Sequence, residues 1–527
     1  MRKALLLAIA LMGLSIGGAA EAQFRPCGQL SFCPPINVQG PIRFDDPSGP
    51  PHDPTAHVLP KGYAASEYFI AGATNVFNYN RQPGLSGAPP GSALVPRYIA
   101  LPYKTRIYVV SPTDPAMFSG DVVIEFLNSS AGFDSAPQWL ISSDYFARAG
   151  YVYIGVTTSA NASIPFLKNG CHAIGPSCNS RYASLFMTDN GQEYEIVSQL
   201  VTALKSGRPS QIPLRTGFGP VKRVYVTGQS QQAGSVITHA NQFSFPLVDG
   251  YFIGSNVHAR ALGGLGKASD LCGGTGAQPY PDCFATLPAG RDLIRTNLPM
   301  PVYHLMTETD LVIFNGALYR QKDADSGPRA SYRLVEIPAV AHNVNVDIEI
   351  LPGVRLKDLC VNDAYGITDP IQGYQVSNAM WLNMRRQVVN GVAPPHAPRI
   401  RTDSNHQIVR NSFGNAEGGV RMPELDAPTN SYFSPLNTGK PACGAPGAPP
   451  APACAPPVLA PYTNLICFLS GSYKPLPRRD IHTLYSKHAD YVHEIWRSAH
   501  ALHQAGFLEQ FEVQKHVDAA KASSVGK

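Results

Sequence analysis

The sequence is poor in charged residues. Asp, Glu, Lys and Arg make up 15% of the 527 residues, against about 25% in a typical soluble domain. The net charge of +5 is small for this length and no run of basic residues stands out, so we expect no nucleic-acid partner. Hydrophobic residues supply 44% of the chain. That share is enough for a sizeable core and rules out wholesale disorder.

Long hydrophobic runs are also lacking. The run Ala4–Ile16 is shorter than the roughly 20 apolar residues that a membrane-spanning helix needs. Two basic residues precede it and Ala20-Glu21-Ala22 follows it, an order typical of a secretory signal peptide. We therefore predict that residues 1–22 are removed, that the mature chain begins near Gln23 without a membrane anchor, and that it is periplasmic or secreted.

The chain has no C-x-x-C pair, so neither a zinc site of that kind nor a dithiol redox centre is predicted. We expect no metal and no cofactor. All ten cysteines follow the signal peptide, and an even number of cysteines in an exported protein favours disulfides. The predicted bridges are Cys27–Cys33, Cys171–Cys178, Cys272–Cys283, Cys443–Cys454 and Cys360–Cys467.

Short apolar runs alternate with helical stretches through the middle of the chain. The length permits two to four domains of roughly 100–200 residues, or one large domain with insertions. Continuous apolar strands alternating with helices indicate an α/β fold, a mostly parallel sheet with helices on both faces. The expected strands are 107–111, 122–127, 151–157, 223–227, 247–253, 302–306 and 332–337, and the expected helices are 136–149, 192–205 and 231–241.

Composition changes along the chain predict its organisation. The first part of the mature chain is rich in proline and glycine and lacks periodicity up to residue 60, so we expect an irregular arm there. A later Pro/Ala/Gly segment, 441–457, is expected to form an exposed loop, and 480–506 has helical periodicity. The predicted units are an arm with leading strands (23–105), an α/β core (106–342) with a lid-like insertion (255–298), and an extension packed on that core (343–527).

One turn carries the strongest chemical signal. Gly228-Gln229-Ser230 follows a buried strand, and a helix follows at once, which is the context of a nucleophile elbow. The turn would lift the Ser230 hydroxyl above the sheet edge, and the small residue Gly228 would allow the helix to cross the strand. The backbone N–H of Gln231 would then lie where an oxyanion develops. The alternative is a serine that caps an ordinary helix.

A serine nucleophile needs a base, and the base needs an orienting carboxylate. In this architecture the order along the chain is Ser, acid, His. His342 follows the last predicted core strand and is the expected base. Asp310 and Glu308 both stand just beyond the strand 302–306. Asp310 is our first choice for the acid, and Glu308 is the alternative.

A second oxyanion donor is expected from the loop after the strand 122–127. That loop reads Asn128-Ser129-Ser130-Ala131-Gly132-Phe133-Asp134. We expect the backbone N–H of Ser129 to be the donor, although the same polar residues are also compatible with a plain turn.

With these motifs the chain resembles the α/β-hydrolase superfamily, and more narrowly the exported bacterial proteins described as α/β-hydrolase domain proteins. The resemblance implies a serine hydrolase of carboxylic esters, with the roles carried to Ser230, His342, and Asp310 or Glu308. The matching stretches are Gly62–Phe77, Glu125–Trp139, Gly228–Gly234, Pro301–Asp310, Ala341-His342 and Gly418–Pro423.

Two departures from the superfamily pattern stand out. The usual elbow has a small residue two positions after the serine, but here that position is Gln232, which could crowd the crossing unless Ala233 and Gly234 relieve it. The superfamily core also normally ends soon after the histidine, whereas this chain continues to residue 527. The Gly418-Gly419 stretch of that extension is a candidate to line the pocket.

The predicted function is hydrolysis of a small-molecule or polymeric ester through an acyl-enzyme. Two alternatives stay open. The same triad could act on another bond or acceptor, as in an amidase, a lactonase, an acyltransferase or a polyester depolymerase. The fold could also have been kept by a non-catalytic binding protein. The sequence fixes neither the acyl chain length nor the oligomeric state.

Overall fold

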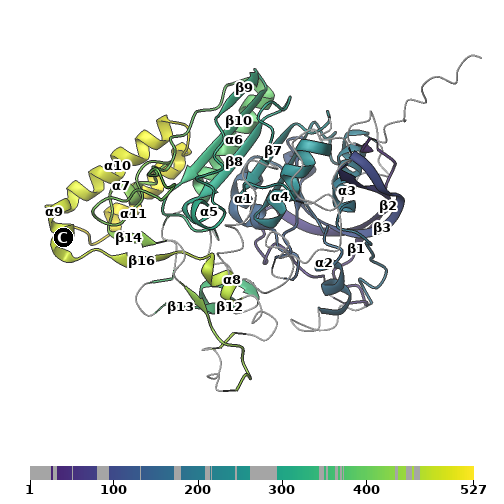
Figure 1. Ribbon diagram of the computed structural model, residues 1–527, viewed down its shortest axis with the longest axis horizontal. Helices are drawn as coiled ribbons and strands as arrows, with labels where there is room; N and C mark the ends of the chain where they lie inside the picture. The colour runs from purple at the N-terminus through teal and green to yellow at the C-terminus, as the bar shows by residue number, and fades with distance from the viewer. Residues whose placement is uncertain are drawn as a thin grey trace, which may run out of the picture.

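The computed structural model gives the protein as a folded chain that ends at Lys527 (Figure 1). The residues it describes are 25–27, 33–49, 51–79, 94–130, 132–170, 180–207, 214, 217–243, 246–260, 293–342, 349–351, 354–362, 366–367, 371, 373–433, 437–446, 454–455 and 463–527.

A ten-stranded sheet forms the centre of the molecule, in the order β1-β2-β3-β5-β4-β6-β7-β8-β10-β9. Along the sheet, β5, β4, β6, β7, β8 and β10 are parallel to one another. Strands β1, β2 and β3 at one edge and β9 at the other pair with their neighbours in antiparallel fashion. The predicted fold class is therefore confirmed. The bounds are β1 Asn37–Ile42, β2 Tyr63–Tyr79, β3 Leu94–Pro112, β4 Asp121–Phe126, β5 Val152–Val156, β6 Arg223–Gln229, β7 Gly250–Gly254, β8 Val302–Thr307, β9 Ala324–Gly327 and β10 Ala330–Ile337.

The central strands are those that the sequence revealed most clearly. Strands β4, β5, β7, β8 and β10 are buried at every position, and a strand buried on both faces reads as a continuous apolar run. Strand β3 is longer than the predicted 107–111, because its first half is largely exposed and only its second half crosses the core. Strand β1 lies in the segment expected to be irregular. Four of its six residues are exposed, so no apolar pattern marked this strand in the sequence.

Helices cover both faces of the sheet. Successive side chains of a strand point to opposite faces: Val224 and Val226 of β6 pack with residues of α3 and α4, whereas Tyr225 packs with residues of α1 and α6. The helices are α1 Pro137–Arg148, α2 Ser163–Pro165, α3 Gln192–Lys205, α4 Gln231–Thr238, α5 Glu308–Ile313, α6 Tyr374–Asn390, α7 Pro423–Asp426, α8 Thr463–Phe468, α9 Arg478–Leu484, α10 His488–Gln504 and α11 Gln510–Ala522.

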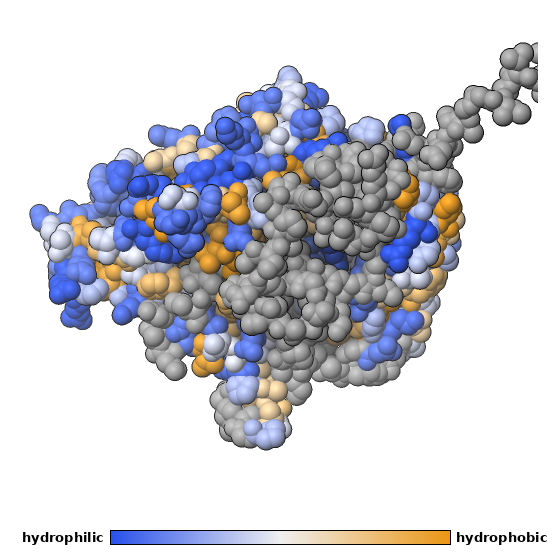
Figure 2. All heavy atoms as spheres, viewed as in Figure 1, coloured by the Kyte–Doolittle hydropathy of each residue, from blue (hydrophilic) through white to orange (hydrophobic). Residues whose placement is uncertain are grey.

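The C-terminal extension packs on the α1–α6 side of the sheet. Leu502 of α10 and Val513 of α11 belong to the same buried cluster as Trp381 of α6. Figure 1 shows these helices beside β8 and β10. On the face seen in Figure 2, hydrophilic residues cover most of the described surface of the extension, and hydrophobic residues form small separate patches.

Short paired strands complete the extension, and one helix predicted there is divided into two. The helix expected over 480–506 is in fact α9 and α10, because the chain leaves the first helix at Tyr485 and a new helix start follows. There the Asp490 carboxylate accepts hydrogen bonds from the backbone N–H of Lys487 at 2.9 Å and the hydroxyl of Ser486 at 2.8 Å. The paired short strands are β11 Glu349–Leu351 with β12 Val354–Arg355, β13 Cys360–Val361 with β15 Thr438–Gly439, and β14 Asn430–Phe433 with β16 Ser472–Pro475.

Three predicted disulfides are confirmed: Cys27–Cys33, Cys360–Cys467 and Cys443–Cys454. The other two predicted pairs, Cys171–Cys178 and Cys272–Cys283, lie outside the described residues, as do the predicted signal peptide and most of the lid-like insertion. None of the helices in the described ranges combines the length and apolar character needed to cross a bilayer.

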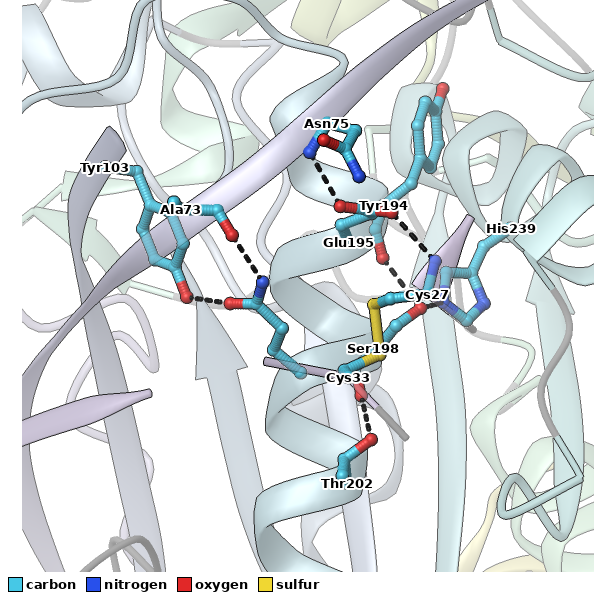
Figure 3. The surroundings of a disulfide bond; sticks show 11 residues. Cys27, Cys33, Ala73, Asn75, Tyr103, Tyr194, Glu195, Ser198, Thr202 and His239 are labelled. Atoms are coloured by element: carbon cyan, nitrogen blue, oxygen red, sulfur yellow. Dashed lines mark hydrogen bonds between the residues drawn. A yellow bond between two sulfur atoms is a disulfide. The ribbon is translucent and has the colours of Figure 1, made fainter. Parts of the chain in front are cut away.

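The first disulfide closes a short loop within the N-terminal arm, and a hydrogen bond beside it joins the arm to the core (Figure 3). The Glu195 carboxylate of α3 accepts a hydrogen bond from the backbone N–H of Cys27 at 2.8 Å and another from that of Asn75 in β2 at 2.7 Å. Burial raises the pKa of Glu195, and these two donors oppose that shift. The buried carboxylate thus joins arm, strand and helix at one point.

Candidate active site

Ser230 lies at the turn between β6 and α4. Its backbone has φ 58° and ψ −122°, a conformation that residues other than glycine rarely adopt and that is found at functional sites. Two hydrogen bonds hold the turn: the Ser230 N–H donates to the Gly254 carbonyl at 2.8 Å, and the Asn256 amide donates to the Ser230 carbonyl at 3.0 Å. The Ser230 side chain is half-buried.

Two glycines allow α4 to cross the strand so closely. A Cβ on Gly228 would lie 2.7 Å from the carbonyl oxygen of Gln232, and a Cβ on Gly234 would lie 2.9 Å from that of His258. The Gln232 side chain causes no crowding, because only its backbone meets Gly228. Its amide instead donates to the Thr158 hydroxyl at 3.1 Å.

A histidine behind Ser230 supports the same turn. His304 of β8 bonds through Nε2 to the carbonyl of Asn256 at 2.6 Å, and the Asn256 amide in turn holds Ser230. Burial lowers the pKa of His304 to about 4. His304 is therefore neutral near pH 7 and adds no positive charge beneath the serine.

His342 contacts both of the groups predicted for it. Its Nε2 lies 2.8 Å from the Ser230 hydroxyl oxygen, and its Nδ1 lies 2.5 Å from Oδ1 of Asp310. An ionised carboxylate only accepts hydrogen bonds, so Nδ1 carries the proton and Nε2 is left to accept from the hydroxyl. The imidazole and the carboxylate are both buried.

The structure places Asp310, and not Glu308, against the histidine. Asp310 lies in the first turn of α5, where its second oxygen accepts from the backbone N–H of Thr307 at 2.7 Å. The two oxygens of Glu308 are used elsewhere: one accepts from the backbone N–H of Ala339 at 2.7 Å, and the other pairs with the Arg410 guanidinium at 2.5 Å. The alternative assignment of Glu308 as the triad acid does not fit this geometry.

The loop after β4 meets the elbow beside Ser230. The Ser129 hydroxyl donates to the side-chain oxygen of Gln231 at 3.2 Å, and the Asn128 amide donates to the carbonyl of Gln229 at 3.0 Å. Strands β4 and β6 are parallel neighbours, so their carboxyl ends bring these loops together. The structure thus unites the two residues expected to bind an oxyanion, while their role as backbone donors stays a prediction.

A buried ionic network fastens that loop to the sheet. The Asp134 carboxylate pairs with Arg106 of β3 at 2.9 Å and accepts a hydrogen bond from Thr157. Arg106 also reaches Glu67 of β2 at 3.4 Å, and all three charged side chains of this network are fully buried. From the arm, His52 bonds to the Asp134 carbonyl at 2.8 Å. The loop is therefore held on several sides.

Sequence reasoning missed one side chain of the site. Gln229, the last residue of β6, places its amide nitrogen 3.2 Å from Nε2 of His342 and 3.3 Å from the His342 carbonyl oxygen. The carbonyl can only accept, so the amide must present its N–H groups to His342. The only signal in the sequence was its position beside the serine.

Gly418 and Gly419 were expected as possible pocket residues. The structure places Gly419 against the strand that leads to His342: a Cβ there would lie 2.8 Å from Pro338 and 2.9 Å from the carbonyl of Glu336.

Among the residues described, no group of three or more His, Cys, Asp or Glu side chains could hold a metal ion.

Several solved structures are similar to part of this chain. An esterase from Pseudomonas putida ECU1011 is 14% identical, with a TM-score of 0.24 over 49% of this chain and 68% of its own. An α/β serine hydrolase without a lid from Xanthomonas campestris is 10% identical, with a TM-score of 0.25 over 55% and 89%. A protein from Klebsiella pneumoniae described as a dienelactone hydrolase is 12% identical, with a TM-score of 0.25 over 52% and 86%.

No curated protein matches the chain. The family model for the alpha/beta hydrolase domain, in contrast, matches residues 38–518. That match runs from β1 into α11 and takes in the sheet, the elbow and most of the extension. The chain therefore belongs to the alpha/beta hydrolase domain family.

Proposed function

We propose that this protein is a serine hydrolase that cleaves carboxylic esters through an acyl-enzyme. The observation that carries the proposal is the contact of His342 with both partners, Ser230 at 2.8 Å and Asp310 at 2.5 Å. A serine hydroxyl, an imidazole and a carboxylate in this order form the arrangement that activates a serine for acyl transfer.

In the first half-reaction Ser230 Oγ attacks the ester carbonyl carbon while Nε2 of His342 takes the hydroxyl proton. Asp310 stabilises the resulting imidazolium through Nδ1–H. The carbonyl oxygen becomes an oxyanion, which the backbone N–H groups of Gln231 and Ser129 would bind. The C–O bond to the alcohol then breaks, and the alcohol leaves with the proton from Nε2, so that Ser230 is acylated.

In the second half-reaction His342 removes a proton from water, and the water oxygen attacks the acyl-enzyme carbonyl. The tetrahedral intermediate uses the same donors. When it collapses, Ser230 Oγ recovers the proton from Nε2 and the carboxylic acid is released. Each cycle therefore consumes one water and restores the enzyme.

We also propose that the protein acts after export. Its three confirmed disulfides fit an oxidising compartment, and the predicted signal peptide would deliver it to one. Detection of a mature N-terminus near Gln23 in the periplasmic or culture fraction tests this part of the proposal.

The catalytic proposal is tested by labelling with a fluorophosphonate and by hydrolysis of a panel of p-nitrophenyl esters. Wild type should be labelled and active, whereas Ser230→Ala should be neither. The chain offers a matched control, because Ser198 lies 3.1 Å from Nε2 of His239 in the core but His239 bonds to the Tyr251 hydroxyl instead of a carboxylate. Ser198→Ala should be labelled like wild type. Undiminished labelling of Ser230→Ala would reject the proposal.

A further inference from the structure

Glu308 connects the extension to the turn that carries His342. Its side chain is 1% exposed, and it lies two residues before the triad acid. One oxygen accepts from the backbone N–H of Ala339, three residues before His342, and the other pairs with Arg410 of the extension. A buried carboxylate that joins two segments in this way can fix the path of the turn between them.

That turn has a conformation that needs support. Ala339 has φ 61°, in the left-handed region that residues with a Cβ avoid. The bond from its N–H to Glu308 is 2.7 Å long and involves a charged acceptor, which makes it stronger than a bond between neutral groups. Glu308 therefore stabilises the conformation that delivers His342 to Ser230.

The extension also contacts the turn that carries His342. We call residues 399–420 the support loop. Isolated bridges tie it together, and Val420 donates its N–H to the carbonyl of Glu336, at the end of β10, at 2.8 Å. Gly419, with φ 73°, approaches Pro338 too closely to allow a side chain. Arg410 projects from this loop to Glu308.

We propose that Glu308 and Arg410 are positioning residues for His342, so that the C-terminal extension is a working part of the catalytic unit. This inference rests on the proposed function, because it assumes that His342 is the base. Arg410 neutralises Glu308. Without Arg410, Glu308 would carry an unpaired buried charge, its bond to Ala339 would weaken as the carboxylate turned toward water, and His342 would move away from Ser230.

The test uses two single variants of Arg410 and one double variant. Arg410→Met removes the cation and keeps a side chain of similar length. Glu308→Gln/Arg410→Met also removes the charge but keeps an amide oxygen for the Ala339 N–H. Arg410→Lys keeps the charge without the guanidinium fork. The matched control is Arg148→Met, because Arg148 of α1 also joins core to extension, through Glu509 at 2.8 Å.

We expect kcat of Arg410→Met to fall by about tenfold to 100-fold with KM changed by less than about threefold, since misplacement of a catalytic group acts on kcat. The double variant and Arg410→Lys should recover most of that loss, and Arg148→Met should keep the wild-type kcat. The assays are run well below each unfolding temperature, so a folding defect alone does not lower kcat.

A second readout does not depend on turnover. The proton between His342 Nδ1 and Asp310 should give a downfield NMR signal that is lost in His342→Ala. It should weaken in Arg410→Met, persist in Arg148→Met and return in the double variant. If Arg410→Met keeps both the signal and a kcat within about twofold of wild type, the inference is overturned. Failure of the proposed function would look different, because wild type itself would then be neither labelled nor active.

Discussion

Asp310 reaches His342 from the first turn of α5, with 2.5 Å between Oδ1 and Nδ1. Its other oxygen is held by the backbone N–H of Thr307, so the carboxylate is fixed on both sides. Glu308, only two residues away, points to Ala339 and Arg410 instead. Two neighbouring carboxylates at the end of one strand thus have different partners, which follow from their positions on the helix.

Substitution Asp310→Asn should lower kcat by about 10⁴-fold, because an amide cannot hold the imidazole in the tautomer that accepts the serine proton. Hydrolysis of p-nitrophenyl acetate at saturating substrate measures the effect. Asp325→Asn is the control, since Asp325 is exposed on β9 and pairs with Arg333. A kcat for Asp310→Asn within about tenfold of wild type would mean that another group orients His342.

Gln229→Met should lower kcat by about tenfold while KM changes little, because His342 would lose the amide that contacts both its ring and its backbone carbonyl. Methionine has a similar length, so the packing is largely kept. Gln514→Met, at an exposed position of α11, is the matched control. Steady-state kinetics on one ester decide the outcome, and equal kcat values for the two variants would exclude a role for Gln229.

Gly228→Ala should disrupt the elbow. The new methyl group would lie 2.7 Å from the Gln232 carbonyl, and overpacking of this kind costs about 1–3 kcal/mol of stability. We expect a lower unfolding temperature together with loss of fluorophosphonate labelling, because the strain shifts Ser230. At Gly327 a Cβ would have its nearest neighbour at 4.0 Å, so Gly327→Ala should change neither quantity. Normal labelling of Gly228→Ala would contradict the prediction.

Glu512→Gln should stabilise the protein at alkaline pH. Burial, with Glu509 nearby, raises the pKa of Glu512 from 4.5 to about 8. Between these values the folded state holds a proton that the unfolded state releases, so the stability from this group is present below about pH 4.5 and is lost as pH rises through about 8. The variant lacks this loss and should gain about 1–3 kcal/mol above pH 8 and little near pH 4.

Urea unfolding at about pH 5 and about pH 9 measures that difference. Glu494→Gln is the control, because Glu494 is a partly exposed side chain paired with Arg497 on the same face of α10. A stability gain for Glu512→Gln that is equal at both pH values would show that charge burial is not its cause.

The sequence revealed the parts of the fold that obey local rules. Buried strands such as β5 and β7 are continuous apolar runs, and the elbow and the histidine follow from strand ends and chain order. The edge strand β1 was missed because its exposed residues carry no apolar pattern. The break between α9 and α10 was missed because it depends on a capping carboxylate, Asp490, within a stretch that keeps helical periodicity.

At the site, chain order indicated Ser230 and His342 and favoured Asp310 as the acid, but it left Glu308 open as the alternative. That choice depends on which side of one helical turn faces the imidazole. The contributions of Gln229 and Arg410 were beyond reach for a different reason. Both make side-chain contacts with residues far along the chain, 113 positions away for Gln229 and 102 for Arg410, and such contacts leave no periodic trace in a single sequence.

The Cys360–Cys467 bridge encloses the whole support loop, because its two ends are 107 positions apart in the chain. Closing a loop of that length lowers the conformational entropy of the unfolded state, which stabilises the folded state by about 4–5 kcal/mol. We therefore expect reduction of this disulfide to unfold the segment that it encloses before the ten-stranded sheet unfolds. The redox state of the surroundings would then govern how long His342 stays in position beside Ser230.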